Sequence, residues 1–256
     1  NNQEPMFNAP GDVISGIWRP GLYFQKEIHQ ALAIDEYAQR SAEQSLRILI
    51  EKLDEILLYI EPSMAGLQTY GHKSRELLIL ACTEVENLWS QYMRLAGAAP
   101  NGRTFTTNDY VKLMNPLHLK EYQIDCKLIR NSYSIQPYSQ WSTTSPTQSL
   151  PWYNAYNKTK HDREQYFSEA TLEHCIHAIA AAIVMFCVRY GPFSLLEGGS
   201  TLSGIFIQHF NVSLVNPETK SFYIPSFNLP SNIRDDLFCG SMTEHIAPWQ
   251  AKPLVI

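Results

Sequence analysis

The sequence lacks the cysteine pattern that marks disulfide-rich or zinc-binding proteins. Its cysteines are odd in number and far apart in the chain, and no two of them form a CxxC pair. They are Cys82, Cys126, Cys175, Cys187 and Cys239. Scattered free cysteines behave as small hydrophobic residues. We therefore expect reduced, buried thiols and a cytoplasmic location.

Long hydrophobic runs are also absent. The longest, AIAAAIVMFCV at residues 178–188, lies between His177 and Arg189. A helix that spans a membrane needs about 20 consecutive apolar residues, so this run is too short. We therefore expect a buried core helix here and no membrane partner.

A basic excess is missing as well. The 20 Lys and Arg residues are outnumbered by 25 Asp and Glu residues, which gives a formal net charge of −5. Proteins that bind nucleic acid without sequence preference usually carry an excess of positive charge. Any contact with nucleic acid must therefore come from a local patch.

The common catalytic signatures do not occur. There is no phosphate loop, no GxGxxG, no HExxH and no GxSxG motif, so most standard enzyme classes lose their expected signature. His174 and His177 have a spacing that can chelate a metal on a helix, but no second cluster matches them. We interpret them as histidines of a helix surface or interface, and we expect neither a metal nor another cofactor.

Hydrophobic periodicity predicts a mostly α-helical protein. Apolar residues at steps of three and four indicate one helix from about 25 to 60, whose more polar first part is a separate or protruding segment. Further helices are predicted over 74–95 and over 108–133, the latter broken near Pro116. A long loop rich in Ser, Thr, Gln and Pro follows at 134–151, and long loops in compact domains are often functional.

The last part of the chain changes in character. A long apolar helix is predicted over 169–190, with Ser168 as its N-cap. Beyond it, segments 205–210, 212–215 and 220–225 have the composition of strands, the last two joined as a hairpin. Three regions result: an extended lead-in (1–24), a helical bundle (25–191) and a β-containing C-terminal appendage, a hairpin or small sheet (192–256).

The segment WYNAYNKTKHDR (152–163) combines aromatic, amide and charged side chains in a predicted short helix. At 100° per residue, two amides, an ammonium and an imidazole share an arc of about 100°. These are Asn154, Asn157, Lys158 and His161. Three aromatic residues occupy the opposite side: Trp152, Tyr153 and Tyr156. The helix therefore has an anchoring face and a polar face.

The residue types on the polar face suit phosphodiester chemistry. An imidazole with a near-neutral pKa can take or give a proton. Lysine balances phosphate charge, and an asparagine amide can orient a ribose hydroxyl or a phosphoryl oxygen. No metal is required if the ribose 2′-hydroxyl is the nucleophile. The alternative is a solvated face, or one that caps and pairs within the bundle.

This segment and its neighbours resemble the HEPN superfamily, helical-bundle domains common in bacterial toxin–antitoxin and phage-defence systems. The resemblance rests on SRELLILACTEVENLW (74–89), WYNAYNKTKHDREQYF (152–167) and ATLEHCIHAIAAAIVMFCVRY (170–190). Many HEPN proteins are metal-independent endoribonucleases that act as dimers. The resemblance therefore implies a HEPN-like bundle with its core at about 74–190, RNA as a partner, a homodimer, and a protein partner from a defence operon.

The resemblance also implies roles for individual residues. His161 matches the motif histidine and is the expected general acid or base, beside Asn157 and Lys158 as further catalytic residues. Lys158 would meet phosphate, and Asn157 would position the substrate. Four residues are the expected substrate-binding set: Asn154, Lys160, Arg163 and Glu84.

Two points are left open by the sequence. Glu84 is expected to orient His161 or to pair with Lys160 or Arg163, and otherwise it is a surface charge beside Glu86. The family motif carries an arginine upstream of its histidine, where this chain offers Asn154, Tyr156 or Asn157. The alternative function is therefore a degenerate, non-catalytic HEPN-like module that binds a protein or nucleotide partner.

Overall fold

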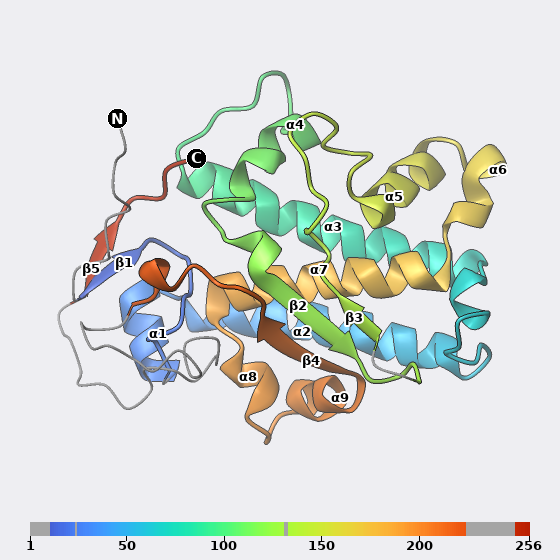
Figure 1. Cartoon of the computed structure of the whole chain (residues 1–256), viewed down its shortest axis with the longest axis horizontal. Helices are drawn as coiled ribbons and strands as arrows, with labels where there is room; N and C mark the ends of the chain where they lie inside the picture. The colour runs from blue at the N-terminus through green and yellow to red at the C-terminus, as the bar shows by residue number, and fades with distance from the viewer. Residues whose placement is uncertain (1–10, 24, 131–132, 224–248) are drawn as a thin grey trace.

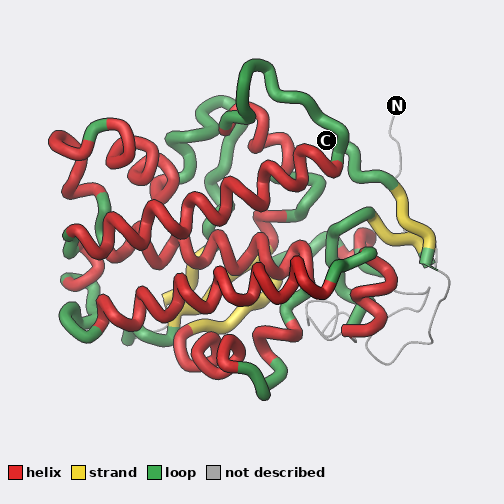
Figure 2. The backbone as a smooth tube through the Cα atoms, turned by 180° about the vertical axis from the view of Figure 1, so that it is seen from behind, coloured by secondary structure: helices red, strands yellow, loops and turns green. Residues whose placement is uncertain are grey.

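The structure of the protein is a computed structural model that describes residues 11–23, 25–130, 133–223 and 249–256. Its long helices are α2 (Glu36–Leu57), α3 (His72–Leu95) and α7 (Leu172–Tyr190). They lie alongside one another and contact each other pairwise (Figures 1 and 2). The described part of the chain is mostly helical, with small sheets, as the sequence predicts.

Helix α7 occupies the centre of this arrangement. Most of its residues are apolar and buried, because α3, α2 and α5 (Pro151–His161) all contact it. By length and composition α7 could also cross a membrane, but 78% of its most apolar stretch is buried within the protein. The prediction of a core helix over this run is therefore confirmed.

The predicted helix over 25–60 is split into two. Helix α1 (Gln25–Leu32) ends before Ala33, whose φ is +49°, and α2 begins after Asp35, whose side chain accepts a hydrogen bond from the Ala38 backbone amide. Neither Pro nor Gly marks this break, and the hydrophobic period continues across it. The sequence therefore predicted a single helix. Five residues of the predicted apolar stripe are buried: Leu46, Leu49, Ile50, Leu53 and Ile56. Its last two residues, Leu57 and Ile60, are half-buried.

The predicted third helix over 108–133 is wrong. This region holds short helical turns followed by strands β2 (Tyr122–Cys126) and β3 (Tyr133–Ile135). The turns are α4 (Thr107–Tyr110), η2 (Val111–Leu113) and η3 (Leu119–Glu121). A further 3-10 turn, η1 (Gly66–Gln68), precedes α3. Side chains along β2 alternate between buried and half-buried, the period of a strand rather than of a helix.

The C-terminal region packs against the helical bundle and does not form a separate appendage. The predicted strand over 205–210 is mostly helix, α9 (Thr201–His209), because Ser200 caps it and its buried residues Leu202, Phe206 and His209 recur at helical spacing. Helix α8 (Phe193–Leu196) precedes it, and α9 contacts α2. Figure 1 shows both short helices beneath the long ones.

The predicted hairpin within the tail is not formed by the described residues. Strand β4 (Phe210–Leu214) pairs with β2 in an antiparallel sheet of order β3-β2-β4. Residues 219–221 form the 3-10 turn η5 (Thr219–Ser221), and residues 224 and 225 lie outside the described part. A second small sheet joins β1 (Asp12–Ile14), in the predicted extended lead-in, to β5 (Gln250–Lys252) in parallel (Figure 1).

The long polar loop before α5 is anchored by aromatic residues. Trp141 stacks on Trp89 of α3 with ring centroids 4.9 Å apart, and Tyr138 is also buried. Four cysteines are free and buried, as predicted: Cys82, Cys126, Cys175 and Cys187. Cys239 lies outside the described residues.

Candidate functional site

Helix α5 carries the residues predicted from the sequence, and its aromatic face anchors it. Trp152, Tyr153 and Tyr156 are buried against α3 and α7, as the helical wheel predicts. The indole nitrogen of Trp152 donates a hydrogen bond to the Pro137 carbonyl at 3.0 Å, which ties α5 to the preceding loop. The anchoring face therefore fixes which residues of α5 turn outward.

The polar face of α5 is accessible. His161 is exposed, and Asn154, Asn157 and Lys158 are half-buried. Within the described part of the chain, the side chains of Asn154, Asn157 and His161 form no hydrogen bond or ion pair. Their donors and acceptors are thus free to meet a ligand.

Lys158 is the exception on this face, because it already has a partner. Its Nζ atom donates to Glu169 Oε1 at 2.8 Å and lies 5.2 Å from the centroid of the Tyr166 ring. Glu169 partly neutralises the ammonium, so Lys158 must exchange this carboxylate for any phosphate it binds. Sequence reasoning missed both Glu169 and Tyr166, which follow α5 on the chain but turn back onto it.

Glu84 forms no hydrogen bond or ion pair with His161, Lys160 or Arg163 in the described structure, so the expected pairing is not made. Burial raises the pKa of Glu84, and its electrostatic neighbour is Tyr190 at the end of α7. Glu84 and Glu86 are two residues apart and therefore about 200° apart around α3. They lie on opposite sides of the helix, so at most one of them can face α5.

Glu86 takes the place that Glu84 was expected to fill. It accepts hydrogen bonds from the hydroxyls of Tyr153, at 2.5 Å, and Tyr156, at 3.1 Å. Lys160 donates to the Tyr156 hydroxyl at 2.9 Å and lies over its ring. A carboxylate, a tyrosine and an exposed ammonium are therefore linked in a chain on the anchoring side of α5, opposite the polar face.

An arginine reaches the end of α5 from another helix. Arg75, in the first turns of α3, donates through Nε and Nη2 to the Thr159 carbonyl at 3.3 and 3.1 Å. Unpaired carbonyls at a helix C-terminus attract cations. Thr159 is two residues before His161. The Arg75 guanidinium therefore lies near the end of α5, although α5 contains no arginine of its own. No local spacing in the sequence connects Arg75 to α5.

Arg163 begins the next short helix, α6 (Arg163–Tyr166), and is exposed. Asp162 separates α5 from α6, and its side chain accepts a hydrogen bond from the Gln165 backbone amide at 3.1 Å. This turn carries Arg163 past the end of α5. Three cations thus lie near the C-terminal end of α5 along the chain or in contact with it: Arg75, Lys160 and Arg163.

The two spaced histidines of α7 bind separate partners. His174 Nδ1 lies 2.7 Å from the Glu169 carbonyl, whereas His177 Nε2 lies 2.8 Å from the Tyr133 hydroxyl, which donates to Glu173. Burial lowers the pKa of His177 to about 4. No group of three or more His, Cys, Asp or Glu side chains arranged for a metal occurs among the described residues.

Comparison with protein-family models, with curated proteins and with solved structures finds no match for this chain. The chemistry and geometry of the residues around α5 are therefore the basis of the functional proposal.

Proposed function

We propose that this protein is a HEPN-like, RNA-directed domain that acts as a metal-independent endoribonuclease of a bacterial defence or toxin–antitoxin system. The observation that carries the proposal is the exposed, unpartnered imidazole of His161 on the same helix face as Asn157. Arg75, Lys160 and Arg163 add positive charge around that end of α5. An RNA contact by a chain of net charge −5 requires such local positive charge.

In the proposed reaction, His161 accepts the proton of the ribose 2′-hydroxyl. The 2′-oxygen then attacks the neighbouring phosphorus, and the bond to the 5′-oxygen of the next nucleotide breaks. The products are a 2′,3′-cyclic phosphate and a 5′-hydroxyl, whose proton returns from an imidazolium or from water. Asn154 and Asn157 donate hydrogen bonds to the substrate, and the cations stabilise the developing negative charge.

Arg75 would supply the guanidinium that the family motif places on the histidine's own helix. Its remaining N–H groups are available, since Nε and Nη2 are the atoms held by the Thr159 carbonyl. A planar guanidinium recognises phosphate through two parallel hydrogen bonds. The role of the missing motif arginine is in this way assigned to a residue of α3.

RNA cleavage in the presence of EDTA tests the nuclease proposal. Wild-type protein should cleave total RNA, and His161→Ala should lose about 100-fold or more of the rate, the usual contribution of a general acid or base. His29→Ala is the control, because His29 is a half-buried histidine of α1, which lies away from α5 and α6. Absence of cleavage by the wild type, or equal cleavage by wild type and His161→Ala, would reject a metal-independent nuclease centred on His161.

A homodimer is part of the proposal, and exposed apolar residues support it. Leu58, Tyr59 and Met64, at and after the C-terminal end of α2, are 77%, 84% and 66% exposed. Contiguous exposed apolar groups mark interaction surfaces. Light scattering should give a dimer for the wild type and a monomer for Tyr59→Glu. Tyr37→Glu, an equally exposed tyrosine at the other end of α2, should remain dimeric; a monomeric wild type would contradict this.

A second candidate is a non-catalytic module that binds a protein or nucleotide partner. Two observations favour it: Glu169 already neutralises Lys158, and α5 itself contains no arginine. In the same assay this module would leave RNA intact. Fluorescence anisotropy with labelled RNA then separates the two remaining outcomes, because a degenerate nuclease retains binding and a protein-binding module does not.

A further inference from the structure

Three aromatic side chains meet where the start of α3 approaches the segment that follows α6. Phe167 begins the 3-10 turn η4 (Phe167–Glu169). The centroid of its ring lies 5.7 Å from that of Tyr70 and 4.9 Å from that of His72. Tyr70 precedes α3, and His72 is the first residue of that helix. These three residues form the aromatic platform, at the end of the molecule where α6 lies (Figure 1).

The aromatic platform is accessible to solvent, and its backbone is held in place. Tyr70 is 50% exposed, His72 is exposed and Phe167 is half-buried. Tyr70 pairs with Thr171, at the start of α7, in an isolated antiparallel β-bridge. The rings are therefore presented on an ordered backbone before any ligand binds, which reduces the conformational entropy that binding must remove.

Positive charge lies next to the aromatic platform. Arg75 follows His72 by three residues on α3, and side chains at this spacing are neighbours on a helix surface. Arg75 also donates to the Thr159 carbonyl near the C-terminal end of α5. The guanidinium thus connects the aromatic platform to the end of α5, where Lys160 and His161 are exposed.

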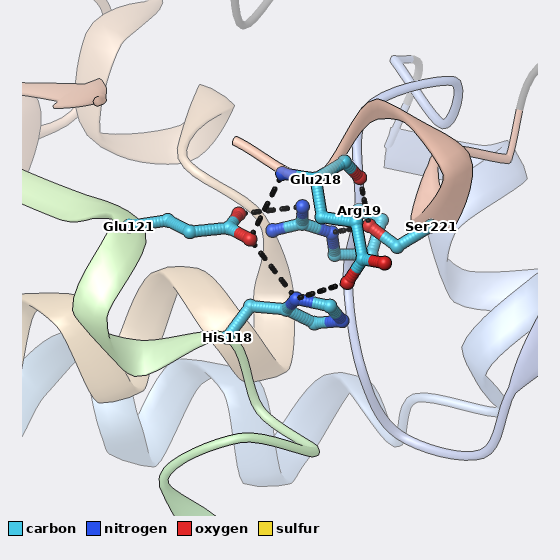
Figure 3. A network of polar contacts seen from close by, with 5 residues as sticks. All are labelled: Arg19, His118, Glu121, Glu218 and Ser221. Carbon is cyan, nitrogen blue, oxygen red and sulfur yellow. Dashed lines mark hydrogen bonds and ion pairs between the residues drawn. The ribbon is translucent and has the colours of Figure 1, made fainter. Parts of the chain in front are cut away.

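A second group of charged side chains, away from α6, is arranged differently. Five side chains or their backbones pair with one another there (Figure 3): Arg19, His118, Glu121, Glu218 and Ser221. The arginine of this group is 1% exposed and lies 2.6 Å from a carboxylate oxygen of the glutamate at position 121. This group therefore joins segments of the fold, whereas the cations near the aromatic platform include exposed ones, Lys160 and Arg163.

We propose that the aromatic platform stacks against an unpaired base of an RNA strand, while Arg75 and the cations at the end of α5 contact the strand's phosphates. Accessible aromatic rings beside cations are the features by which proteins hold single strands, because every base has a face that can stack. The cations favour RNA over an apolar protein surface as the occupant. The inference rests on the proposed RNA-directed function and identifies Tyr70 and His72 as residues that position the substrate.

Fluorescence anisotropy of the full chain with a labelled 2′-O-methyl RNA strand tests this contact. The methyl group blocks the 2′-oxygen, so the strand cannot be cleaved by the proposed reaction. An abasic strand of the same length keeps the phosphates but has no bases to stack. The intact strand should bind about tenfold or more tighter than the abasic strand, the usual effect of base stacking. Equal affinities, or no binding of the intact strand, would overturn the proposal.

Variants of the aromatic platform locate the stacking contact. Tyr70→Ala should weaken binding of the intact strand about tenfold, whereas Tyr70→Phe keeps the ring and should bind like the wild type. His72→Ala, at the other exposed ring, should also weaken binding. Tyr37→Ala removes an exposed tyrosine at the start of α2 and is the matched control. Wild-type affinity in Tyr70→Ala and His72→Ala would place the base elsewhere and reject the assignment.

The salt dependence of binding separates stacking from charge. Arg163→Gln removes an exposed cation, and it should reduce the slope of log Kd against log salt by about 0.7, the value for one phosphate contact on a single strand. Tyr70→Ala should weaken binding at every salt concentration and leave the slope unchanged. A smaller slope in Tyr70→Ala would show that charged contacts were lost instead, which would contradict a stacking role.

The result can be distinguished from that of the nuclease test. Binding that depends on Tyr70, without cleavage of unmodified RNA, would support the aromatic platform and reject the nuclease. Cleavage of RNA together with equal binding by wild type and Tyr70→Ala would reject the aromatic platform alone.

Discussion

Single residues around α5 acquire their properties from partners that lie far away in the sequence. Glu86 accepts hydrogen bonds from two tyrosines of α5, whereas Glu84 on the same helix faces the end of α7. The sequence presents the two glutamates as equivalent neighbours. Only the rotation of α3 relative to α5 distinguishes them, and that rotation is set by packing across the core.

His177 gives the clearest prediction at the residue scale. Burial lowers its pKa from 6.5 to about 4, so the folded protein holds the imidazole neutral. Between these pH values the unfolded chain binds a proton that the folded chain does not. The free energy of unfolding should therefore decrease as the pH falls from 6.5 to 4, by up to about 3 kcal/mol from this group.

Urea unfolding at several pH values measures this dependence. His177→Gln should show a shallower decrease than the wild type in that window, because the titrating group is gone. His161→Gln removes an exposed imidazole and should keep the wild-type slope. Identical slopes for wild type and His177→Gln would show that the buried imidazole is not the source of the pH dependence.

At the scale of elements, the first residue of α7 shows how a tertiary contact can override a cap predicted from the local sequence. Ser168 and Thr171 both have the chemistry of an N-cap, and the sequence favoured Ser168. In the structure Thr171 caps the helix, its hydroxyl accepting a hydrogen bond from the His174 amide at 3.2 Å. The Leu172 amide donates to the Thr69 carbonyl, so the contact with the segment before α3 selects the starting residue.

The two candidate caps form a matched pair for measurement. Thr171→Ala should lower the free energy of unfolding by about 1 kcal/mol, the usual value of a lost N-cap. Ser168→Ala should change it by less than about 0.5 kcal/mol, because Ser168 is exposed and caps no helix. Equal effects in chemical denaturation would mean that the helix starts earlier than residue 172.

At the scale of the whole molecule, the tail and the bundle form one packing unit. Strand β4 pairs with β2 along its full length, and α9 contacts α2. Phe206, Phe210 and Val212 are buried in the same core as the helices. A division at residue 191 therefore follows the composition of the sequence rather than the arrangement of these elements.

Truncation tests that integration. A chain that ends at residue 191 should lose cooperative thermal unfolding by circular dichroism, because it exposes the apolar surface of α2 and leaves β2 without β4. A cooperative transition close to that of the full chain would instead show that the bundle folds by itself. The full chain measured in parallel is the reference.

The sequence by itself determined the features that repeat within one element. The apolar stripes of α2 and α3, the burial of α7 and the two faces of α5 follow from a helical period over a few turns. The exposure of His161 and the burial of Trp152, Tyr153 and Tyr156 needed no more than this. These are local properties, fixed by spacing along the chain.

Tertiary structure alone decided which elements meet. Arg75 beside Thr159, Glu169 on Lys158, and Arg19 against Glu121 and Ser221 each join segments whose spacing carries no signal. The strand at 122–126 likewise depends on β4, nearly ninety residues later. Such contacts result from the angles and register at which helices and strands pack to bury their apolar faces, and the period of any single element does not contain them.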